Sequence, residues 1–176
     1  MAQISFRTKL STINSTVILQ LPAEASTKLP SKGMVMVNGT INGLPIQTAL
    51  EPDGKGGHWF KIDQAIVKKI NAKTGDNVEL DIEPTKNWPD PQIPDDLKIA
   101  LNNNPNANSV WVDTTPIARW DWIRWINSTK NPETRKKRIS VACSKLESGM
   151  RRPCCFNRAM CTDPNFSNNG ILLDQA

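Results

Sequence analysis

Four prolines between residues 84 and 94 divide the sequence into two parts of different character. Each proline lacks a backbone N–H donor and restricts the residue before it, so this stretch cannot form a regular helix or a central strand. We interpret residues 84–94 as a linker between an N-terminal domain, residues 1–83, and a helical region, residues 95–156. A polar tail, residues 157–176, follows the helical region, and we expect it to be mobile.

Before the linker, apolar residues alternate with polar ones and glycine turns interrupt the pattern, which is typical of short, half-buried strands. The clearest signal covers residues 35–46, where Asn42 and Gly43 provide the two positive-φ positions of a type I′ hairpin turn. A second turn is predicted at residues 73–76, and residues 64–70 are predicted to form a short helix. Several short strands in one small domain indicate a closed or nearly closed β-barrel, because closure removes unpaired edges.

Beyond the linker the spacing of apolar residues becomes helical, first over residues 95–102. Thr115-Pro116 and Asn131-Pro132 each place a side-chain acceptor before a proline, which predicts the starts of two more helices. Gly149 is a plausible end for the last one. The predicted fold class is therefore α+β, a small N-terminal β-barrel followed by a helical C-terminal segment packed against it.

The positive charge is concentrated in the last third of the chain. Residues 116–176 carry 11 Lys and Arg against 5 Asp and Glu, within a formal net charge of +5. In the helix that starts at Pro132, Arg135 is predicted to point about 30° from the centre of the apolar stripe. A guanidinium so placed needs a partner, either Asp121 or Glu133 inside the protein, or the carboxylate or phosphate of a ligand.

The helix that starts at Pro116 contains three tryptophans, and its apolar residues surround the helix axis. Such a helix is normally sandwiched in a core, although one indole beside an arginine could instead form a stacking surface. We predict a non-enzymatic binding protein with a cleft between barrel and helices for an anionic small molecule or an acidic protein surface. The residues assigned to this cleft are Arg135, Arg138, Lys130, Trp122, Asp121 and Glu133. Nucleic-acid binding by the basic helix is an alternative.

Two adjacent cysteines, Cys154 and Cys155, lie among Arg151, Arg152 and Arg158. Neighbouring cations favour the thiolate, so a thiol-dependent activity is a further alternative. Adjacent cysteines suit a single tetrahedral zinc ion poorly, and we predict no metal site. The single histidine has no nucleophile at a recognised spacing, and the sequence lacks a phosphate-binding glycine loop, so neither catalytic residues nor a cofactor are predicted.

The first residues lack the apolar segment of a signal peptide, and no stretch approaches the roughly 18 apolar residues that span a bilayer. We therefore expect a soluble, cytoplasmic protein whose cysteines remain thiols.

Three segments, TTPIARWDWIRWI, KNPETRKKRI and ACSKLESGMRRPCCF, resemble in order and spacing the YdeI/OmpD-associated, or bacteriocin-protection, family. Upstream, VNGTINGLP, GGHWFKI and GDNVEL resemble the small β-barrel domain of unknown function that often precedes it. The resemblance covers about residues 3–156. It implies a bacterial, cytoplasmic protein without an established enzymatic activity or cofactor, and the family name implies tolerance of stress or antimicrobial peptides. The positions that carry the motif are Asp121, Trp122, Ile123, Lys130, Glu133, Thr134, Arg135, Arg138, Cys154, Cys155 and Phe156.

Overall fold

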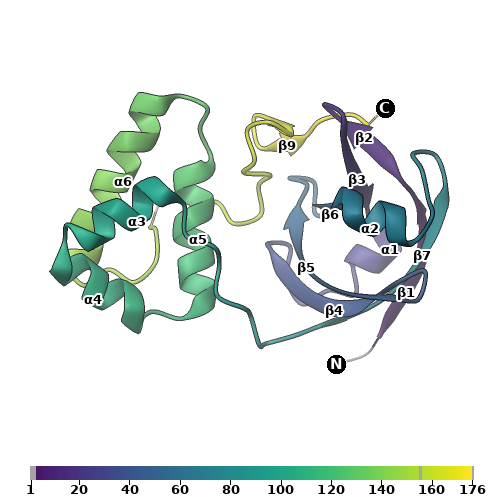
Figure 1. The fold of residues 1–176 in the computed structure, drawn as a ribbon, viewed down its shortest axis with the longest axis horizontal. Coiled ribbons are helices and arrows are strands. Elements are labelled where there is room, and N and C mark those ends of the chain that lie inside the picture. Colours follow the sequence, from purple (N-terminus) through teal and green to yellow (C-terminus); the bar gives the residue numbers. More distant parts are fainter. Residues whose placement is uncertain (1–2, 155, 176) are drawn as a thin grey trace. The chain divides into compact units, whose positions relative to one another are not determined.

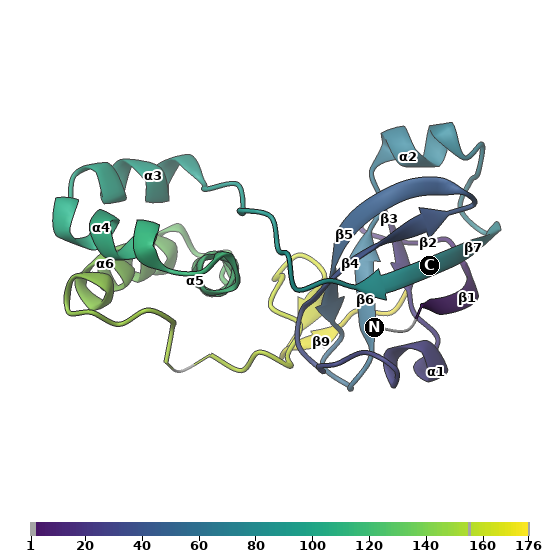
Figure 2. The same ribbon diagram turned by 90° about the horizontal axis from the view of Figure 1, so that it is seen from below.

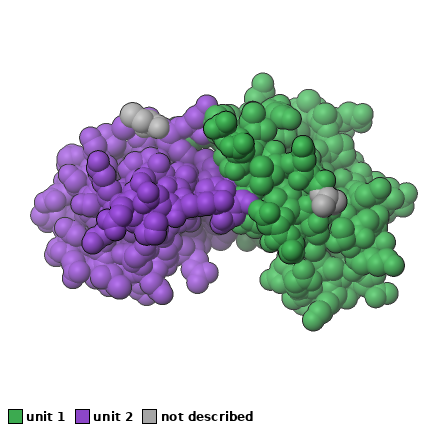
Figure 3. All heavy atoms as spheres, turned by 90° about the horizontal axis from the view of Figure 1, so that it is seen from above, with its two compact units in different colours: residues 1–87, 158–161, 166–176 green, residues 88–157, 162–165 purple. Residues whose placement is uncertain are grey.

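The chain forms two compact units in the computed structural model, which describes residues 3–154 and 156–175. Unit 1 comprises residues 1–87, 158–161 and 166–176, and unit 2 comprises residues 88–157 and 162–165 (Figure 3).

Unit 1 is built on a seven-stranded antiparallel sheet with the strand order β1-β7-β4-β5-β6-β3-β2 (Figure 1). The strands are β1 (Ile4–Lys9), β2 (Ser11–Ile13), β3 (Thr16–Gln20), β4 (Val35–Ile41), β5 (Leu44–Pro52), β6 (His58–Lys61) and β7 (Asn77–Pro84). Two short helices, α1 (Ala23–Ser26) and α2 (Gln64–Lys69), connect some of them.

The sheet is strongly curled. Strands β1 and β2 stand at opposite ends of the strand order, yet only Leu10 separates them in the chain. The two edges must therefore approach each other, and the Thr8 hydroxyl on β1 donates to the carbonyl of Gln20 on β3 at 2.9 Å. Leu10 is fully buried in the apolar core that the curled sheet encloses. The predicted α+β class, with a barrel-like sheet before the helices, is confirmed.

Local turn chemistry explains the strand connections. Asn42 and Gly43 have φ values of 47° and 83°, as a type I′ turn requires, and Ile41 pairs with Leu44 across the hairpin. At the second predicted turn the Asp76 carboxylate accepts a hydrogen bond from the Lys73 N–H at 3.0 Å. Both predicted turns are confirmed, as is the short helix α2.

The other face of the sheet carries a second apolar cluster. Because side chains alternate along a strand, Ile18 and Trp59 point away from the main core. They are covered by part of the segment that we expected to be a mobile tail. Within it, β8 (Ser167–Asn168) and β9 (Ile171–Leu172) form a small hairpin, and the Phe166 ring lies 5.3 Å from that of Trp59. A segment that is polar overall thus places a few apolar side chains against an apolar surface of the sheet.

Unit 2 consists of four helices (Figures 1 and 2). These are α3 (Asp95–Asn102), α4 (Pro105–Asp113), α5 (Pro116–Asn127) and α6 (Pro132–Glu147). The sequence predicted α3, α5 and α6, including the caps of the last two: the Thr115 hydroxyl accepts from the Ala118 N–H at 3.2 Å, and the Asn131 side chain accepts from the Glu133 N–H at 2.9 Å.

The helix α4 was not predicted from the sequence. Asn104-Pro105 has the same form as the other two helix starts, but the Asn104 amide donates to the Ala100 carbonyl at 2.7 Å instead of capping α4. Ala107 and Trp111 on α4 are buried in the core of unit 2. The helices α3, α5 and α6 supply the rest of that core.

The middle of the proline-rich stretch, residues 88–90, packs on α5. The Trp120 indole donates to the Pro89 carbonyl at 2.8 Å, and its ring meets that of Trp88 edge to face with the centroids 6.2 Å apart. Arg119 pairs with Asp90 at 2.6 Å. Residues 88–90 therefore belong to unit 2. Within the described part of the chain, no helix is long and apolar enough to cross a bilayer.

Candidate binding groove on the helical unit

Arg135 lies on α6 and forms a bidentate ion pair with Asp96 in the first turn of α3. Its Nε lies 2.7 Å from one carboxylate oxygen and its Nη2 lies 3.0 Å from the other. The third contact runs from Nη1 to the side-chain oxygen of Asn127, at 2.6 Å. The Arg135 side chain is 26% exposed, so it lies at the edge of the helical core and not inside it.

The ion pair shifts the pKa of both partners. The hydrogen bonds from Arg135 hold the pKa of the Asp96 carboxyl below its usual value, and the Asp96 carboxylate raises the pKa of Arg135. The internal partners predicted for Arg135 from the sequence were Asp121 and Glu133, and Asp96 was not among them. Asp96 lies 39 residues from Arg135, and no local pattern links the two.

A groove of about 770 Å³ adjoins the Arg135–Asp96 pair, within unit 2. Apolar side chains form much of its surface, and Ile99 is 61% exposed there. Lys136 also lines the groove, and its ammonium group makes no hydrogen bond or ion pair with any residue that the structure describes. The lining residues are Asp96, Ile99, Ala100, Asn103, Asn104, Pro132, Arg135, Lys136, Ile139, Ser140, Cys143, Ser144 and Glu147.

Of the six residues predicted to bind an anion, only Arg135 lines this groove. Arg138 donates to the Trp125 carbonyl at 2.9 Å and to the Ser128 hydroxyl at 2.6 Å. Trp122 is buried, and its indole donates to the Arg151 carbonyl at 2.9 Å. Its ring is therefore part of the core of unit 2 and does not form a binding surface. Lys130 and Glu133 are exposed at the start of α6.

The sixth residue, Asp121, belongs to a different cluster. It is buried and forms ion pairs with Arg152 and with Arg124, the latter at 3.8 Å. Arg124 is the arginine that enters the core, and its guanidinium lies 5.1 Å from the centre of the Phe156 ring. Its burial was not predicted, because the apolar residues of α5 surround the helix axis and do not mark one side as buried.

The predicted thiol site is only partly described. Cys154 is exposed, whereas Cys155 lies outside the described residues. Two of the nearby arginines form ion pairs with carboxylates: Arg151 pairs with Asp113 at 3.0 Å, and Arg152 pairs with Asp121. Part of the positive field that would favour a thiolate is thereby compensated. Among the described residues, no group of three His, Cys, Asp or Glu side chains is arranged to hold a metal ion.

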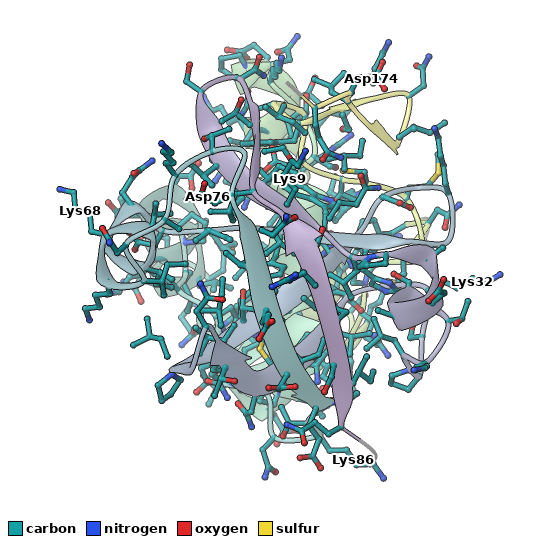
Figure 4. All side chains as sticks on the ribbon, turned by 90° about the vertical axis from the view of Figure 1, so that its right-hand side faces the viewer. Lys9, Lys32, Lys68, Asp76, Lys86 and Asp174 are labelled. Atoms are coloured by element: carbon teal, nitrogen blue, oxygen red, sulfur yellow. The ribbon has the colours of Figure 1, made fainter. Side chains whose placement is uncertain are left out.

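Unit 1 has fewer features that would bind an anionic ligand than the groove on unit 2 has. Lys32, Lys68 and Lys86 project outward from separate places around the unit (Figure 4). A smaller pocket, of about 380 Å³, is lined by polar side chains that include Asp53, Lys55 and Asp174. One oxygen of the Asp53 carboxylate already accepts from the N–H groups of Lys55 and Gly57 at 2.7 and 2.8 Å. These bonds shape the loop after β5.

Comparison with protein families divides the chain in the same way. Residues 90–149 match the family described as "Bacteriocin-protection, YdeI or OmpD-Associated", and residues 6–82 match a domain of unknown function, DUF1905. The first part of the chain thus matches DUF1905, and the second part matches the YdeI/OmpD-associated family. The resemblance seen in the sequence is confirmed, and no match was found among curated proteins. Every residue that lines the groove lies within residues 90–149, which match the YdeI/OmpD-associated family, whereas Cys154 lies beyond the matched residues.

Proposed function

We propose that this protein is a cytoplasmic, non-enzymatic binding protein that contributes to tolerance of stress or antimicrobial peptides. Its binding surface is the groove between α3 and α6, which holds the apolar part of a ligand while an anionic group lies beside Lys136. The observation that carries this proposal is the groove itself, an open and largely apolar surface next to an ammonium group that no described residue pairs. The family description supports the role in tolerance.

The geometry supports binding of an anion at this end of the groove. Asp96 and Asn127 hold the Arg135 guanidinium from two sides. Because this side chain is already ordered, binding a ligand against it loses little conformational entropy. Because Asp96 offsets the charge of Arg135, the net positive charge comes from Lys136. An anionic ligand would pair with Lys136 and lie against an already ordered arginine.

The groove is poorly equipped for catalysis. Its one thiol, Cys143, has a raised pKa because of burial and, to a smaller extent, the nearby charge of Glu147. A thiol with a raised pKa is largely protonated at neutral pH and is a weak nucleophile. The groove contains hydroxyl groups, from Ser140 and Ser144, but no histidine that could act as their base.

The proposal is tested with anilinonaphthalene sulfonate, a fluorescent probe that combines an apolar body with one anionic group. We expect the full-length protein to bind it, Ile99→Asn to weaken binding, and Lys136→Glu to weaken it roughly fivefold, because an attractive surface ion pair becomes a repulsive one. Lys137→Glu is the matched control, since Lys137 is the next residue of α6 and does not line the groove.

Fluorescence titration of the four proteins, each first shown to be folded by circular dichroism, measures the dissociation constants. If Lys137→Glu weakens binding as much as Lys136→Glu, the probe responds to overall charge and the groove is not the site. Failure of the full-length protein to bind the probe would also contradict the proposal.

A further inference from the structure

Both walls of the groove follow helical periodicity. On α6 the lining residues recur at spacings of three and four from Pro132 to Glu147, and on α3 and just after it they recur in the same way from Asp96 to Asn104. At 1.5 Å per residue, the α6 wall is roughly 22 Å long. The groove is therefore a strip between two helices and not a compact chamber.

The shape of this strip favours a helix over a compact small molecule. A cavity of about 770 Å³ spread along a wall of this length is shallow. Small-molecule sites usually enclose most of the surface of their ligand, which a shallow strip does not do. An amphipathic helix needs to bury only one face, and its side chains at i, i+3, i+4 and i+7 would meet Ile99, Ile139 and Cys143 along the groove.

The charges along the strip favour one orientation of the bound helix relative to α6. Lys136 lies near the start of α6, next to the mutually neutralising Arg135–Asp96 pair, and Glu147 lies at the end of α6. A helix carries partial negative charge at its C-terminus and partial positive charge at its N-terminus. The complementary arrangement places the C-terminal end of the bound helix beside Lys136 and its N-terminal end beside Glu147.

We infer that the groove between α3 and α6 binds an amphipathic helix of a partner polypeptide, antiparallel to α6. This inference rests on the proposed function and names its ligand: the anionic group beside Lys136 is the acidic C-terminal turn of the partner helix. The apolar stripe of the partner covers Ile99, which is otherwise exposed.

The test uses two fluorescein-labelled model peptides of about four helical turns with the same leucine stripe. The first carries lysines in its N-terminal turn and glutamates in its C-terminal turn, and the second carries these charges reversed. Fluorescence anisotropy with the full-length protein should show that the first peptide binds roughly threefold to tenfold more tightly, as expected for two favourable surface ion pairs with Lys136 and Glu147. Circular dichroism of each free peptide corrects the comparison for helical content, because the end charges of the first peptide oppose its own helix dipole. The double variant Lys136→Glu/Glu147→Lys should invert that preference.

The matched control is the double variant Glu133→Lys/Lys137→Glu, which exchanges the same charge types on α6 at positions outside the groove and should retain the original preference. Equal binding of the two peptides, or a preference that the groove variant does not invert, would overturn the antiparallel orientation. If neither peptide binds although the sulfonate probe does, the partner is not a helix and the proposed function stands. If the sulfonate probe also fails to bind, both proposals fail.

Discussion

At the scale of single residues, the histidine of β6 shows how burial determines protonation. His58 is fully buried, and its Nε2 lies 2.9 Å from the Gly33 carbonyl, so Nε2 must carry a proton and donate it. Its Nδ1 makes no hydrogen bond within the described part of the chain. Burial lowers the His58 pKa below 6.5, although the Gly33 carbonyl, the Asp53 charge and the Ser31 backbone partly oppose this. The neutral ring is therefore the stable form inside unit 1.

This protonation state predicts acid sensitivity. The unfolded chain takes up a proton at His58 near pH 6.5, before the folded chain does, so the stability from the neutral ring is lost as the pH falls below 6.5. We expect the thermal midpoint of the wild type to fall more steeply over this range than that of His58→Gln, which cannot titrate there. Titration of the His58 ring by NMR gives an independent reading, and a pKa at or above 6.5 would contradict the prediction.

At the scale of helices and strands, local chemistry was readable from the sequence and non-local pairing was not. The Asn42-Gly43 turn, the caps of α5 and α6 and the barrel-like sheet depend on neighbouring residues or on alternation along a strand. The helix α4 was missed because its would-be cap, Asn104, bonds to the preceding helix. The groove was missed because its walls are distant in sequence, and no pattern within α6 shows that Asp96 meets Arg135.

The N-cap of α6 is a direct test of this local chemistry. The Asn131 side chain accepts hydrogen bonds from the N–H groups of Glu133 and Thr134 at 2.9 and 3.3 Å. Asn131→Ala should therefore lower the free energy of unfolding by about 1 kcal/mol. The neighbouring control Lys130→Ala should change it by less than about 0.5 kcal/mol. Urea unfolding measures both, and equal effects would show that the cap contributes nothing particular to α6.

At the scale of the whole molecule, each unit has its own apolar core, and unit 1 is completed by residues that follow unit 2 in sequence. Phe166 and Leu172 are buried against Ile18 and Trp59, and the Leu172 N–H donates to the Asp53 carbonyl at 2.9 Å. Unit 1 is therefore discontinuous in sequence: it has three parts, and most of unit 2, residues 88–157, lies between the first and the second. The family match at residues 6–82 covers only the first of these parts.

The contribution of the later part can be measured with one substitution. Because Phe166 is buried and lies against Trp59, Phe166→Ala should lower the free energy of unfolding by about 3 kcal/mol. Asp174→Ala, at an exposed position of the same segment, should have little effect. Urea unfolding distinguishes the two cases, and an equally small effect of both substitutions would support the mobile tail that the sequence predicted.

The position of β1 in the sheet has a consequence for synthesis. Its hydrogen-bonded neighbour is β7, and the paired residues Ser5 and Asp81 are 76 positions apart. A chain that emerges from the ribosome with its N-terminus first must hold β1 without that partner until β7 has been translated. Contacts of such long range form slowly, and the waiting strand is open to wrong pairing. The helices of unit 2, whose contacts span shorter stretches of chain, can then form before residues 161–172 arrive to cover Trp59.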